Sequence, residues 1–306
     1  MRLSRTGAVL IFTAAAWLFT GTAAYAAGRV SGSSPVYHYE VRRDLGVYFG
    51  NADEVIAAVR ESLSRHDWRI TVSFRAGSEC MDDIPDIIRE VMDYARAETA
   101  SPSEGDYLRT TMGGYELGYS HTIADDTPGQ TVYAYKAVIT PDYYTTPEQE
   151  EQVDDEVKRI ITELDITEDM GEHERFMAVY RYICENVRYD RVHRSHSGFH
   201  LKSTAFGALI YRRATCQGYA AAMYRLLREC GVGARVITGT AFYPDGEEYH
   251  AWNIVRIDGK WYNTDVMWDI QDSTEDYLLR SDEDFLYHER SPEFSTPEFY
   301  AEYPMA

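Results

Sequence analysis

The chain of 306 residues is poor in cysteine and in basic residues. It has four cysteines, none before position 80, so no cysteine near the N-terminus offers a lipid attachment point. No cysteine spacing resembles a four-cysteine zinc site, and no run of Asp and Asn has EF-hand spacing, so neither a metal nor another cofactor is expected. Lys and Arg number 30 against 50 Asp and Glu, for a net charge of −20. This charge repels phosphates and anionic lipids, so nucleic acid and anionic membrane surfaces are not expected partners.

The apolar run at the N-terminus is short for a membrane span. Arg2 and Arg5 precede an apolar stretch over residues 8–19, and Ala24-Tyr25-Ala26 offers small residues at the positions that signal peptidase reads. We therefore predict a cleaved signal peptide over residues 1–26 rather than a membrane anchor. The mature protein is expected to be secreted or held at the cell surface, with no integral span. Cleavage leaves it two units more negative, because the leader holds two arginines and no acid.

The four cysteines leave two alternatives open. In an oxidising compartment Cys80, Cys184, Cys216 and Cys230 could pair as two disulfides. If Cys216 is instead a free nucleophile, at least one further cysteine is unpaired. Cys184 and Cys230 both fall on predicted helices, and the sequence does not determine whether they lie close enough to pair.

Residues 27–166 are predicted to form a small α/β or α+β domain. Apolar residues recur at helical spacing in three segments, and two others have the alternating or β-branched character of strands. The helical segments are 53–66, 83–97 and 147–164, and the strand segments are 68–74 and 131–140. The region has no catalytic constellation. Its tyrosines could line a binding surface, but they are typical of half-buried sheet positions.

Residues 167–306 are predicted to form a second domain, which begins with an amphipathic helix over 172–187. A polar segment over 189–200 follows, with His193, His196 and His200. This spacing could suit a metal site, but the segment is rich in Ser, Arg and Gly and has no helical frame. We therefore expect a solvated or substrate-facing loop.

Cys216 is predicted to begin a helix. Apolar residues follow it at intervals of three or four, Thr215 can act as N-cap, and Gly231 supplies a stop. The unpaired N–H groups of a first helical turn favour a thiolate and could hold an oxyanion. Gly218 is expected to keep the approach to the thiol open. A cysteine at a helix start is more often a packing residue, so this signal alone is weak.

His250 and an aspartate are predicted to share one face of a hairpin. Asp258-Gly259 between two apolar-rich runs is a strong signal for a two-residue turn, which pairs residue 257 with residue 260. Continued along the strands, this register makes both Asp265 and Asp269 diagonal neighbours of His250. Each residue alone is better explained as structural, but together with Cys216 they indicate a site for nucleophilic acyl transfer.

The motifs that carry these residues resemble the transglutaminase-like superfamily, especially its exported bacterial members. They are Cys216-Gln217-Gly218-Tyr219, His250-Ala251-Trp252-Asn253 and Lys260-Trp261-Tyr262-Asn263-Thr264-Asp265. The resemblance extends from about residue 172 to the C-terminus, including Tyr189-Asp190 and Ser281-Asp282-Glu283. It implies a papain-like core, with the nucleophile's helix packed on an antiparallel sheet. It also implies Cys216 as nucleophile, His250 as general base and acid, and Asp265, not Asp269, as the orienting carboxylate.

The function expected from this resemblance is cysteine acyl transfer or hydrolysis through a thioester. The bond attacked would be an amide or γ-carboxamide of a protein or peptide, with cell-wall peptide among the possible substrates. An amine acceptor would give a cross-link, and water would give deamidation or peptide hydrolysis. The alternative is a catalytically inactive binding module of the same fold at the cell surface. The second oxyanion donor, common upstream in the family, has no assigned residue.

Overall fold

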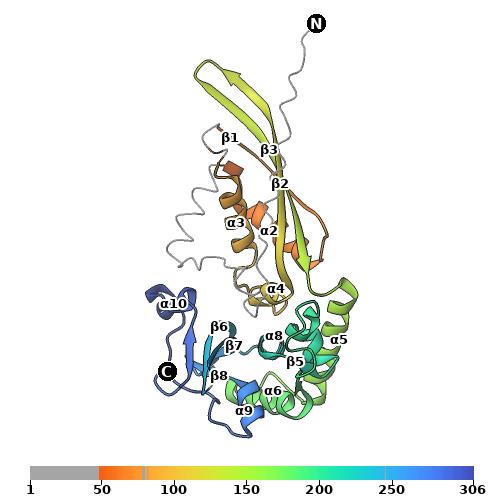
Figure 1. Ribbon diagram of the computed structural model, residues 1–306, viewed down its shortest axis with the longest axis vertical. Coiled ribbons are helices and arrows are strands. Elements are labelled where there is room, and N and C mark those ends of the chain that lie inside the picture. The colour runs from red at the N-terminus through yellow and green to blue at the C-terminus, as the bar shows by residue number, and fades with distance from the viewer. Residues whose placement is uncertain (1–47, 78–79, 81, 245) are drawn as a thin grey trace.

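The computed structural model describes residues 48–77, 80, 82–244 and 246–306. Figure 1 shows an upper part, with a sheet and two helices, and a lower part that is richer in helices. The long hairpin of the upper part points away from the lower part. The predicted signal peptide lies outside the described residues and stays a prediction.

The upper part is an antiparallel sheet packed against helices. Its elements are α2 (Ala52–Ser64), β1 (Ile70–Gly77), α3 (Ile84–Ala95), α4 (Asp106–Thr110), β2 (Met112–Thr127) and β3 (Gln130–Tyr143). The strands lie in the order β1-β3-β2 and all pairs are antiparallel, so this part is α+β. The apolar faces predicted for 53–66 and 83–97 become the buried sides of α2 and α3, which share one core with the sheet.

Sequence reasoning missed strand β2 and the short helix α4 of this part. Strand β2 pairs along β3, but only Met112 and Leu117 of its side chains are buried. The outer half of β2 is largely exposed. Such a strand has no need for alternating apolar and polar residues, and that alternation is the pattern that reveals strands in a sequence.

The lower part holds the cysteine helix at its centre. Its helices are α5 (Pro147–Glu163), α6 (Glu172–Asn186), η3 (His200–Ser203), α7 (Ala205–Leu209), α8 (Cys216–Glu229), α9 (Val266–Asp272), η4 (Pro292–Phe294) and α10 (Pro297–Glu302). Its strands are β4 (Arg188–Tyr189), β5 (Arg213–Ala214), β6 (Ala234–Tyr243), β7 (Gly246–Ile257), β8 (Lys260–Thr264) and β9 (His288–Arg290). The main sheet has the order β8-β7-β6-β9 with antiparallel neighbours.

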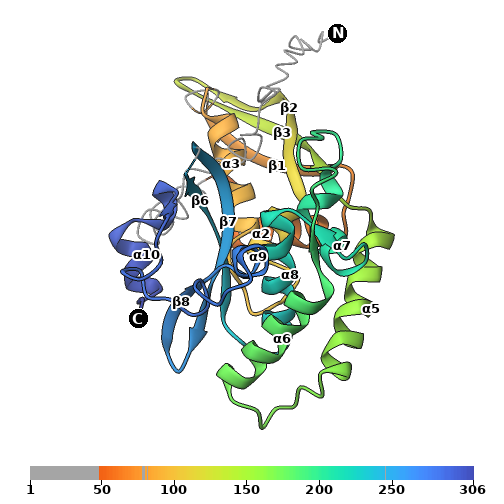
Figure 2. The ribbon, with the colours of Figure 1, turned by 60° about the horizontal axis from the view of Figure 1, so that its bottom comes forward.

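Helix α8 lies between this sheet and helices α5–α7, as Figure 2 shows. One core joins α5, α6 and α8 to the inner faces of β6 and β7. The predicted fold class, a cysteine-bearing helix packed on an antiparallel sheet, is therefore confirmed. Helix α5 joins this lower core although it precedes the predicted domain boundary at residue 166. The division into residues 27–166 and 167–306 stays a prediction.

A buried ion pair joins the upper part to the lower one. Arg235 Nε on β6 donates to Asp106 Oδ2 on α4 over 2.7 Å, and the backbone N–H of Val236 donates to the same oxygen over 2.8 Å. Glu98 lies 3.6 Å from Arg235 Nε and accepts from the Tyr224 hydroxyl of α8 over 2.9 Å. Burial and the charge of Asp106 raise the pKa of Glu98 to about 7. These contacts hold the upper part against α8 and β6.

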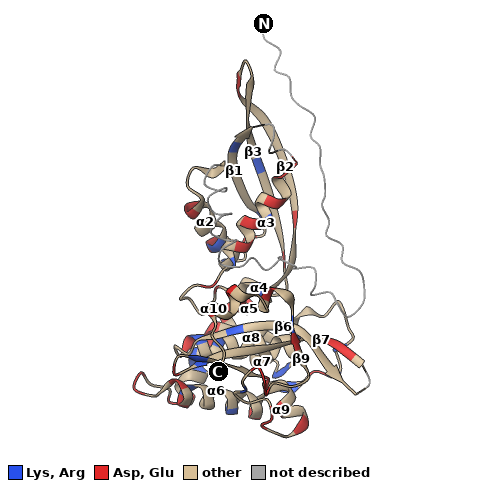
Figure 3. Cartoon of the chain, turned by 90° about the vertical axis from the view of Figure 1, so that its left-hand side faces the viewer, with Lys and Arg blue, Asp and Glu red and all other residues tan. Residues whose placement is uncertain are grey.

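Acidic side chains are spread over both parts rather than gathered in one place, as Figure 3 shows. This distribution agrees with the excess of 50 acidic over 30 basic residues. Among the helices of the described ranges, none has both the length and the apolar character needed to cross a membrane.

Asp106→Ala should lower the free energy of unfolding by about 3–5 kcal/mol, because it leaves Arg235 buried without its main counter-charge. The measurement is urea unfolding followed by circular dichroism. The control is Asp155→Ala, which removes an exposed partner of Lys158 at 3.8 Å and should change stability by less than about 1 kcal/mol. If both variants lower the free energy of unfolding equally, Asp106 does not hold the two parts together.

Candidate active site

Cys216 is the first residue of α8, as predicted, and it is half-buried. Thr215 occupies the N-cap position, but its side chain makes no capping hydrogen bond. Its hydroxyl instead donates to the carbonyl of Lys202 over 3.3 Å. The first N–H groups of a helix have no partner within the helix. Here they stay uncovered by the N-cap side chain, so they and the positive end of the helix dipole are available to an anion beside Cys216.

Gly218 has a different role from the one predicted. A Cβ at this position would lie 2.7 Å from the Lys202 carbonyl oxygen and 2.8 Å from the Cβ of Ala214. The glycine therefore lets the backbone of residues 202–204 and β5 pack directly on the first turn of α8. The expectation that it keeps the substrate approach open is wrong, because the space beside it is filled by the chain.

The predicted hairpin forms, but it ends earlier than predicted. Asp258 and Gly259 have φ values of 51° and 83°, the left-handed pair of a type I′ turn, and residues 253–257 pair with 260–264 in the predicted register. The strand β8 then stops at Thr264. Asp265 leaves the sheet and becomes the N-cap of α9 instead of pairing across from residue 252.

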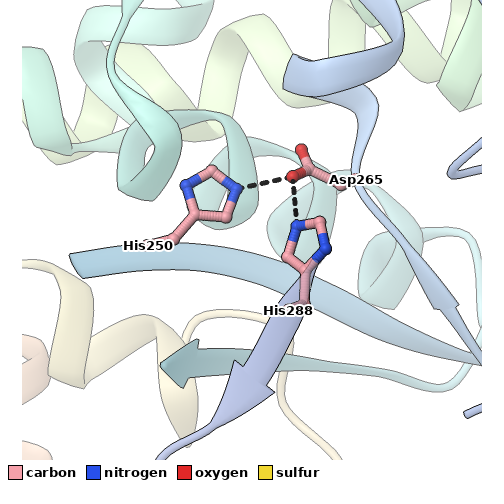
Figure 4. A group of neighbouring side chains, drawn as sticks. All are labelled: His250, Asp265 and His288. Carbon is pink, nitrogen blue, oxygen red and sulfur yellow. Dashed lines mark hydrogen bonds and ion pairs between the residues drawn. The ribbon is translucent and has the colours of Figure 1, made fainter. Parts of the chain in front are cut away.

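His250 and Asp265 nevertheless meet. His250 Nε2 on β7 lies 2.5 Å from Asp265 Oδ2, and both side chains are 2% exposed (Figure 4). The other oxygen, Oδ1, accepts the backbone N–H groups of Met267 and Trp268 over 3.0 and 3.1 Å. Because the helix cap fixes one oxygen, the other is held toward His250. The carboxylate contact thus comes from a helix cap rather than from strand pairing.

Asp269, the second aspartate in the predicted register, is directed elsewhere. It accepts hydrogen bonds from the Tyr180 hydroxyl over 2.7 Å and from the backbone N–H of Tyr277 over 2.9 Å. Burial raises the pKa of Asp269 to about 6. The choice of Asp265 over Asp269, which the resemblance implied and the register left open, agrees with the hydrogen bonds to His250.

The electrostatics of the pair favour a protonated His250 beside an ionised Asp265. Burial alone would lower the pKa of His250, but the charge and hydrogen bond of Asp265, with smaller contributions from Cys216, raise it to about 10. Burial alone would raise the pKa of Asp265, but His250 and His288 hold it well below its usual range. Since Nε2 is used by Asp265, the ring atom left for Cys216 is Nδ1.

Two tyrosines also lie within the electrostatic reach of Cys216. Burial, with the charge of Cys216 as the next cause, raises the pKa of Tyr189 to about 12. Burial is also the main cause of the raised pKa of Tyr243, to which Cys216 contributes. The strand pair β4–β5 places Tyr189 opposite Ala214, two residues before the cysteine.

All four cysteines lie in the described ranges and all are free, so the two-disulfide alternative is wrong for this structure. Burial raises the pKa of Cys184 and of Cys230 to about 11. Both thiols are therefore poor nucleophiles at neutral pH.

His288 is the residue of this cluster that sequence reasoning missed. Its Nε2 lies 3.2 Å from Asp265 Oδ2, the same oxygen that contacts His250, and its side chain is fully buried on β9. It follows the segment Ser281-Asp282-Glu283 by only a few residues, but β9 is three residues long and has no alternation. Its place beside Asp265 depends on the pairing of β9 with β6, which the sequence did not indicate.

The ligand atoms of His250, Asp265 and His288 lie within 4.8 Å of one another, a set of donor types that a metal could use. The three histidines of the 189–200 loop do not form such a set. His193 Nδ1 contacts Asp190 Oδ2 over 2.8 Å, and His200 stacks on Tyr144 with ring centroids 4.5 Å apart. Within the described residues, that loop is better described as part of the wall around the site.

Lys202 and Arg194 fix this loop. Lys202 Nζ donates to three loop carbonyls, those of His193, Arg194 and His196, over 2.8, 3.1 and 2.6 Å. Arg194 forms an ion pair with Glu248 on β7. The middle of the loop is therefore tied both to the segment beside α8 and to the strand that carries His250.

Two cavities are lined by neighbours of the site residues, although Cys216, His250 and Asp265 themselves line neither. One, of about 320 Å³, lies where the two parts meet and is lined by Arg109 and Gly113 from the upper part and by Gln217, Thr240 and Tyr249 from the lower part. The other, of about 300 Å³, is lined by Tyr189, Arg194, Tyr243 and Glu248. Gln217, which lines the first cavity, is 5% exposed, and its Nε2 has no hydrogen-bond partner among the described atoms.

Residues 159–266 match the family model of the transglutaminase-like superfamily. This range contains Cys216, His250 and Asp265, and it excludes His288. Two curated relatives carry the name kyphoscoliosis peptidase. The mouse protein is 30% identical over 105 residues, and the human protein is 31% identical over 108 residues. The match covers 31% of this chain and 15% of each relative, so the chain spans a small fraction of their length.

Two solved structures are also similar. One is described as the crystal structure of a TGase, with 21% identity, a TM-score of 0.34, and coverage of 49% of this chain and 44% of that one. The other is described as a putative cysteine protease from Cytophaga hutchinsonii, with 17% identity, a TM-score of 0.33, and coverage of 57% and 68%.

Gly218→Ala should lower the free energy of unfolding by about 1–3 kcal/mol, because the added methyl group overlaps the Lys202 carbonyl and Ala214. Thermal or urea unfolding measures the change. Gly118→Ala is the matched control, since no heavy atom lies within 4 Å of its added Cβ. If Gly218→Ala is as stable as this control, the close packing under α8 is not as described.

Proposed function

Because residues 159–266 belong to the transglutaminase-like superfamily, we propose that this chain is an exported, thiol-dependent acyl transferase or hydrolase. It acts on amide or γ-carboxamide bonds of proteins or peptides, with Cys216 as nucleophile, His250 as base and acid, and Asp265 as the group that orients His250. Support comes above all from one arrangement: a half-buried cysteine at a helix start without a side-chain cap, which interacts with a histidine held by a buried carboxylate.

The first step is transfer of the Cys216 proton to His250. Asp265 fixes the ring through Nε2, so Nδ1 receives the proton and the resulting imidazolium faces a carboxylate. With the pKa of His250 at about 10, the ring holds this proton throughout the neutral range. An imidazolium beside the thiol favours the thiolate, which is the form that attacks a carbonyl.

Attack by the thiolate on the substrate carbonyl forms a C–S bond and places negative charge on the carbonyl oxygen. The unpaired N–H groups at the start of α8 are the donors for this oxyanion. His250 then gives its proton to the leaving amine or ammonia, and the C–N bond breaks to leave a thioester. An amine or water, deprotonated by His250, attacks the thioester and regenerates the thiol.

The substrate lies across the site between the two cavities. Gln217 Nε2 is the donor for an acyl or backbone carbonyl in the cavity between the parts, to which Arg109 and Gly113 of the upper part contribute a wall. The upper part then forms one wall of the substrate-binding cavity. Export through residues 1–26 would bring the enzyme to secreted proteins or cell-wall peptides.

Changing Asp265 or His250 should change how Cys216 reacts with iodoacetamide. In the wild type, labelling of Cys216 should persist well into the acidic range, because the proton resides on His250. Asp265→Asn weakens the hold on that proton, so labelling should begin at higher pH. In His250→Ala, labelling should follow an ordinary thiol, and turnover should fall by at least about 10⁴-fold. Peptide mass spectrometry at Cys216 across pH measures the labelling.

Asp269→Asn is the matched control, because this buried aspartate does not contact His250. Its labelling profile should match that of the wild type. If Asp269→Asn shifts the profile and Asp265→Asn does not, the orienting carboxylate is assigned wrongly. A wild-type profile identical to that of His250→Ala would support the inactive binding module instead.

Transfer and hydrolysis are separated by their products. Glutamine-containing peptides and peptidoglycan peptides are incubated with the enzyme and a primary amine, and amine incorporation is measured against ammonia release. A transferase incorporates the amine, and a hydrolase releases ammonia or cleaves the peptide without incorporating it. The Cys216→Ser variant should give neither product, and equal product from that variant would contradict the proposal.

A further inference from the structure

We propose that a third cavity, lined by aromatic rings beside the catalytic cluster, is a subsite for an aromatic or large aliphatic side chain of the peptide substrate. The volume of this aromatic cavity is about 600 Å³, within the usual range of about 300–1,000 Å³ for ligand pockets. Its aromatic and apolar lining residues are Phe242, Tyr243, Pro244, Trp268, Tyr277 and Tyr287. The inference deepens the proposed function and rests on it for the identity of the ligand as a substrate.

The aromatic cavity continues the two cavities already described. It shares Tyr243 and Gln271 with the cavity of about 300 Å³. That cavity in turn shares Glu247 and Glu248 with the cavity where the two parts meet. Tyr243 is also one of the two tyrosines within the electrostatic reach of Cys216. A peptide whose reacting carbonyl lies at Cys216 can therefore extend toward the cavity between the parts in one direction and toward the aromatic cavity in the other.

The inner wall of the aromatic cavity is attached to the catalytic residues. Trp268 lies on α9, with its ring centroid 5.6 Å from that of His250, and its Nε1 donates to the Tyr243 hydroxyl over 3.0 Å. The Tyr277 ring packs edge-on against Trp268 with centroids 4.9 Å apart. The backbone carbonyl of Tyr277 accepts from the N–H of Asp265 over 3.1 Å. The rings of this wall are therefore held in fixed positions relative to His250 and Asp265.

The outer rim of the aromatic cavity exposes large apolar side chains. Phe242 is 38% exposed and Tyr287 is 60% exposed. The backbone N–H of Phe242 donates to the carbonyl of Tyr287 over 2.9 Å, which keeps the two segments together. Tyr287 has a φ of 65°, a left-handed backbone that is costly for a large side chain and that is found mostly at functional sites. Exposed apolar side chains gathered beside a cavity are typical of a ligand-binding surface.

The lining favours an apolar ligand over a cation, although aromatic faces attract both. The N–H of Trp268 and the hydroxyl of Tyr243 are bonded to each other, so the inner wall presents mainly ring carbon. Among the described residues that line the cavity, the one acid is Asp272, and it is exposed. A solvated carboxylate adds little to the binding of a cation. Burial of apolar surface is therefore the main source of affinity in this cavity.

Peptide binding to an inactive variant tests the subsite. Cys216→Ser protein is titrated with fluorescein-labelled heptapeptides that carry glutamine at the centre, alanine elsewhere, and phenylalanine, leucine or lysine at one varied position. Fluorescence anisotropy gives the dissociation constants. At one position, phenylalanine and leucine should tighten binding by about 10- to 100-fold relative to alanine, because the side chain is buried. Lysine at that position should bind no better than alanine.

Substitutions at the rim connect this preference to the aromatic cavity. In the Cys216→Ser background, the double variant with Phe242→Ala and Tyr287→Ala should lower the preference for phenylalanine over alanine about tenfold. Binding of the peptide that carries only alanine around its glutamine should be unchanged. Tyr211→Ala is the matched control, since Tyr211 is 50% exposed but lines none of the three cavities. Circular dichroism checks that the variants are folded.

Three results would overturn the proposal. The first is a preference for lysine, which would assign the cavity to a cation. The second is a preference for phenylalanine that the double variant retains in full. The third is the absence of any position at which phenylalanine or leucine binds better than alanine, including the case in which no peptide binds.

The subsite and the proposed function can fail separately. If phenylalanine-dependent binding is found but the wild-type protein forms no acyl group on Cys216, the proposed catalysis is wrong and the subsite is retained as a peptide-binding site. If Cys216 is acylated but no side-chain preference is found, the proposed function is retained and the subsite is wrong.

Discussion

The carboxylate of Asp265 is the point on which the site depends. Its four contacts come from three elements of the fold: His250 on β7, His288 on β9, and the backbone N–H groups of Met267 and Trp268 in the first turn of α9. A buried carboxylate is costly unless its lone pairs are used, and here each oxygen has two partners. The end of β8, the start of α9 and the edge strand β9 are thereby fixed to one another, and His250 is held toward Cys216.

The other half of the site is the start of α8, which carries Cys216. Thr215 directs its hydroxyl to Lys202, so the N-cap side chain does not cover the start of α8. Gly218 lets the same backbone segment pack against the helix without a side chain between them. The segment around Lys202 thus supports the nucleophile's helix from outside, while the upper part is fixed against α8 and β6 through Asp106 and Arg235. Both sets of contacts stabilise the helix that carries Cys216. The cavity of about 320 Å³ lies where the upper and lower parts meet.

Much of this arrangement could be predicted from the sequence, because it depends on local patterns. The apolar spacing after Cys216 gave α8, and the Asp258-Gly259 turn gave the register of β7 and β8. The pattern could not give the end of β8, because the choice between one more strand pair and a helix cap at Asp265 is made by tertiary contacts. His288 could not be predicted for a similar reason. Its strand β9 is three residues long and pairs with β6, which is distant from it in the sequence. Strand β2 was missed because its outer half is largely exposed, which removes the alternating pattern.

The account rests on Cys216 forming a covalent acyl intermediate under the control of His250. The most direct measurement is intact-protein mass spectrometry after rapid acid quench of the enzyme mixed with an activated ester of a γ-glutamyl peptide, followed by peptide mapping. The account predicts an added mass equal to the acyl group, located on Cys216, lost on treatment with hydroxylamine, and absent from Cys216→Ser and strongly reduced in His250→Ala. An acyl group on Cys80, Cys184 or Cys230 in its place, or equal acylation of the His250→Ala variant, would contradict it.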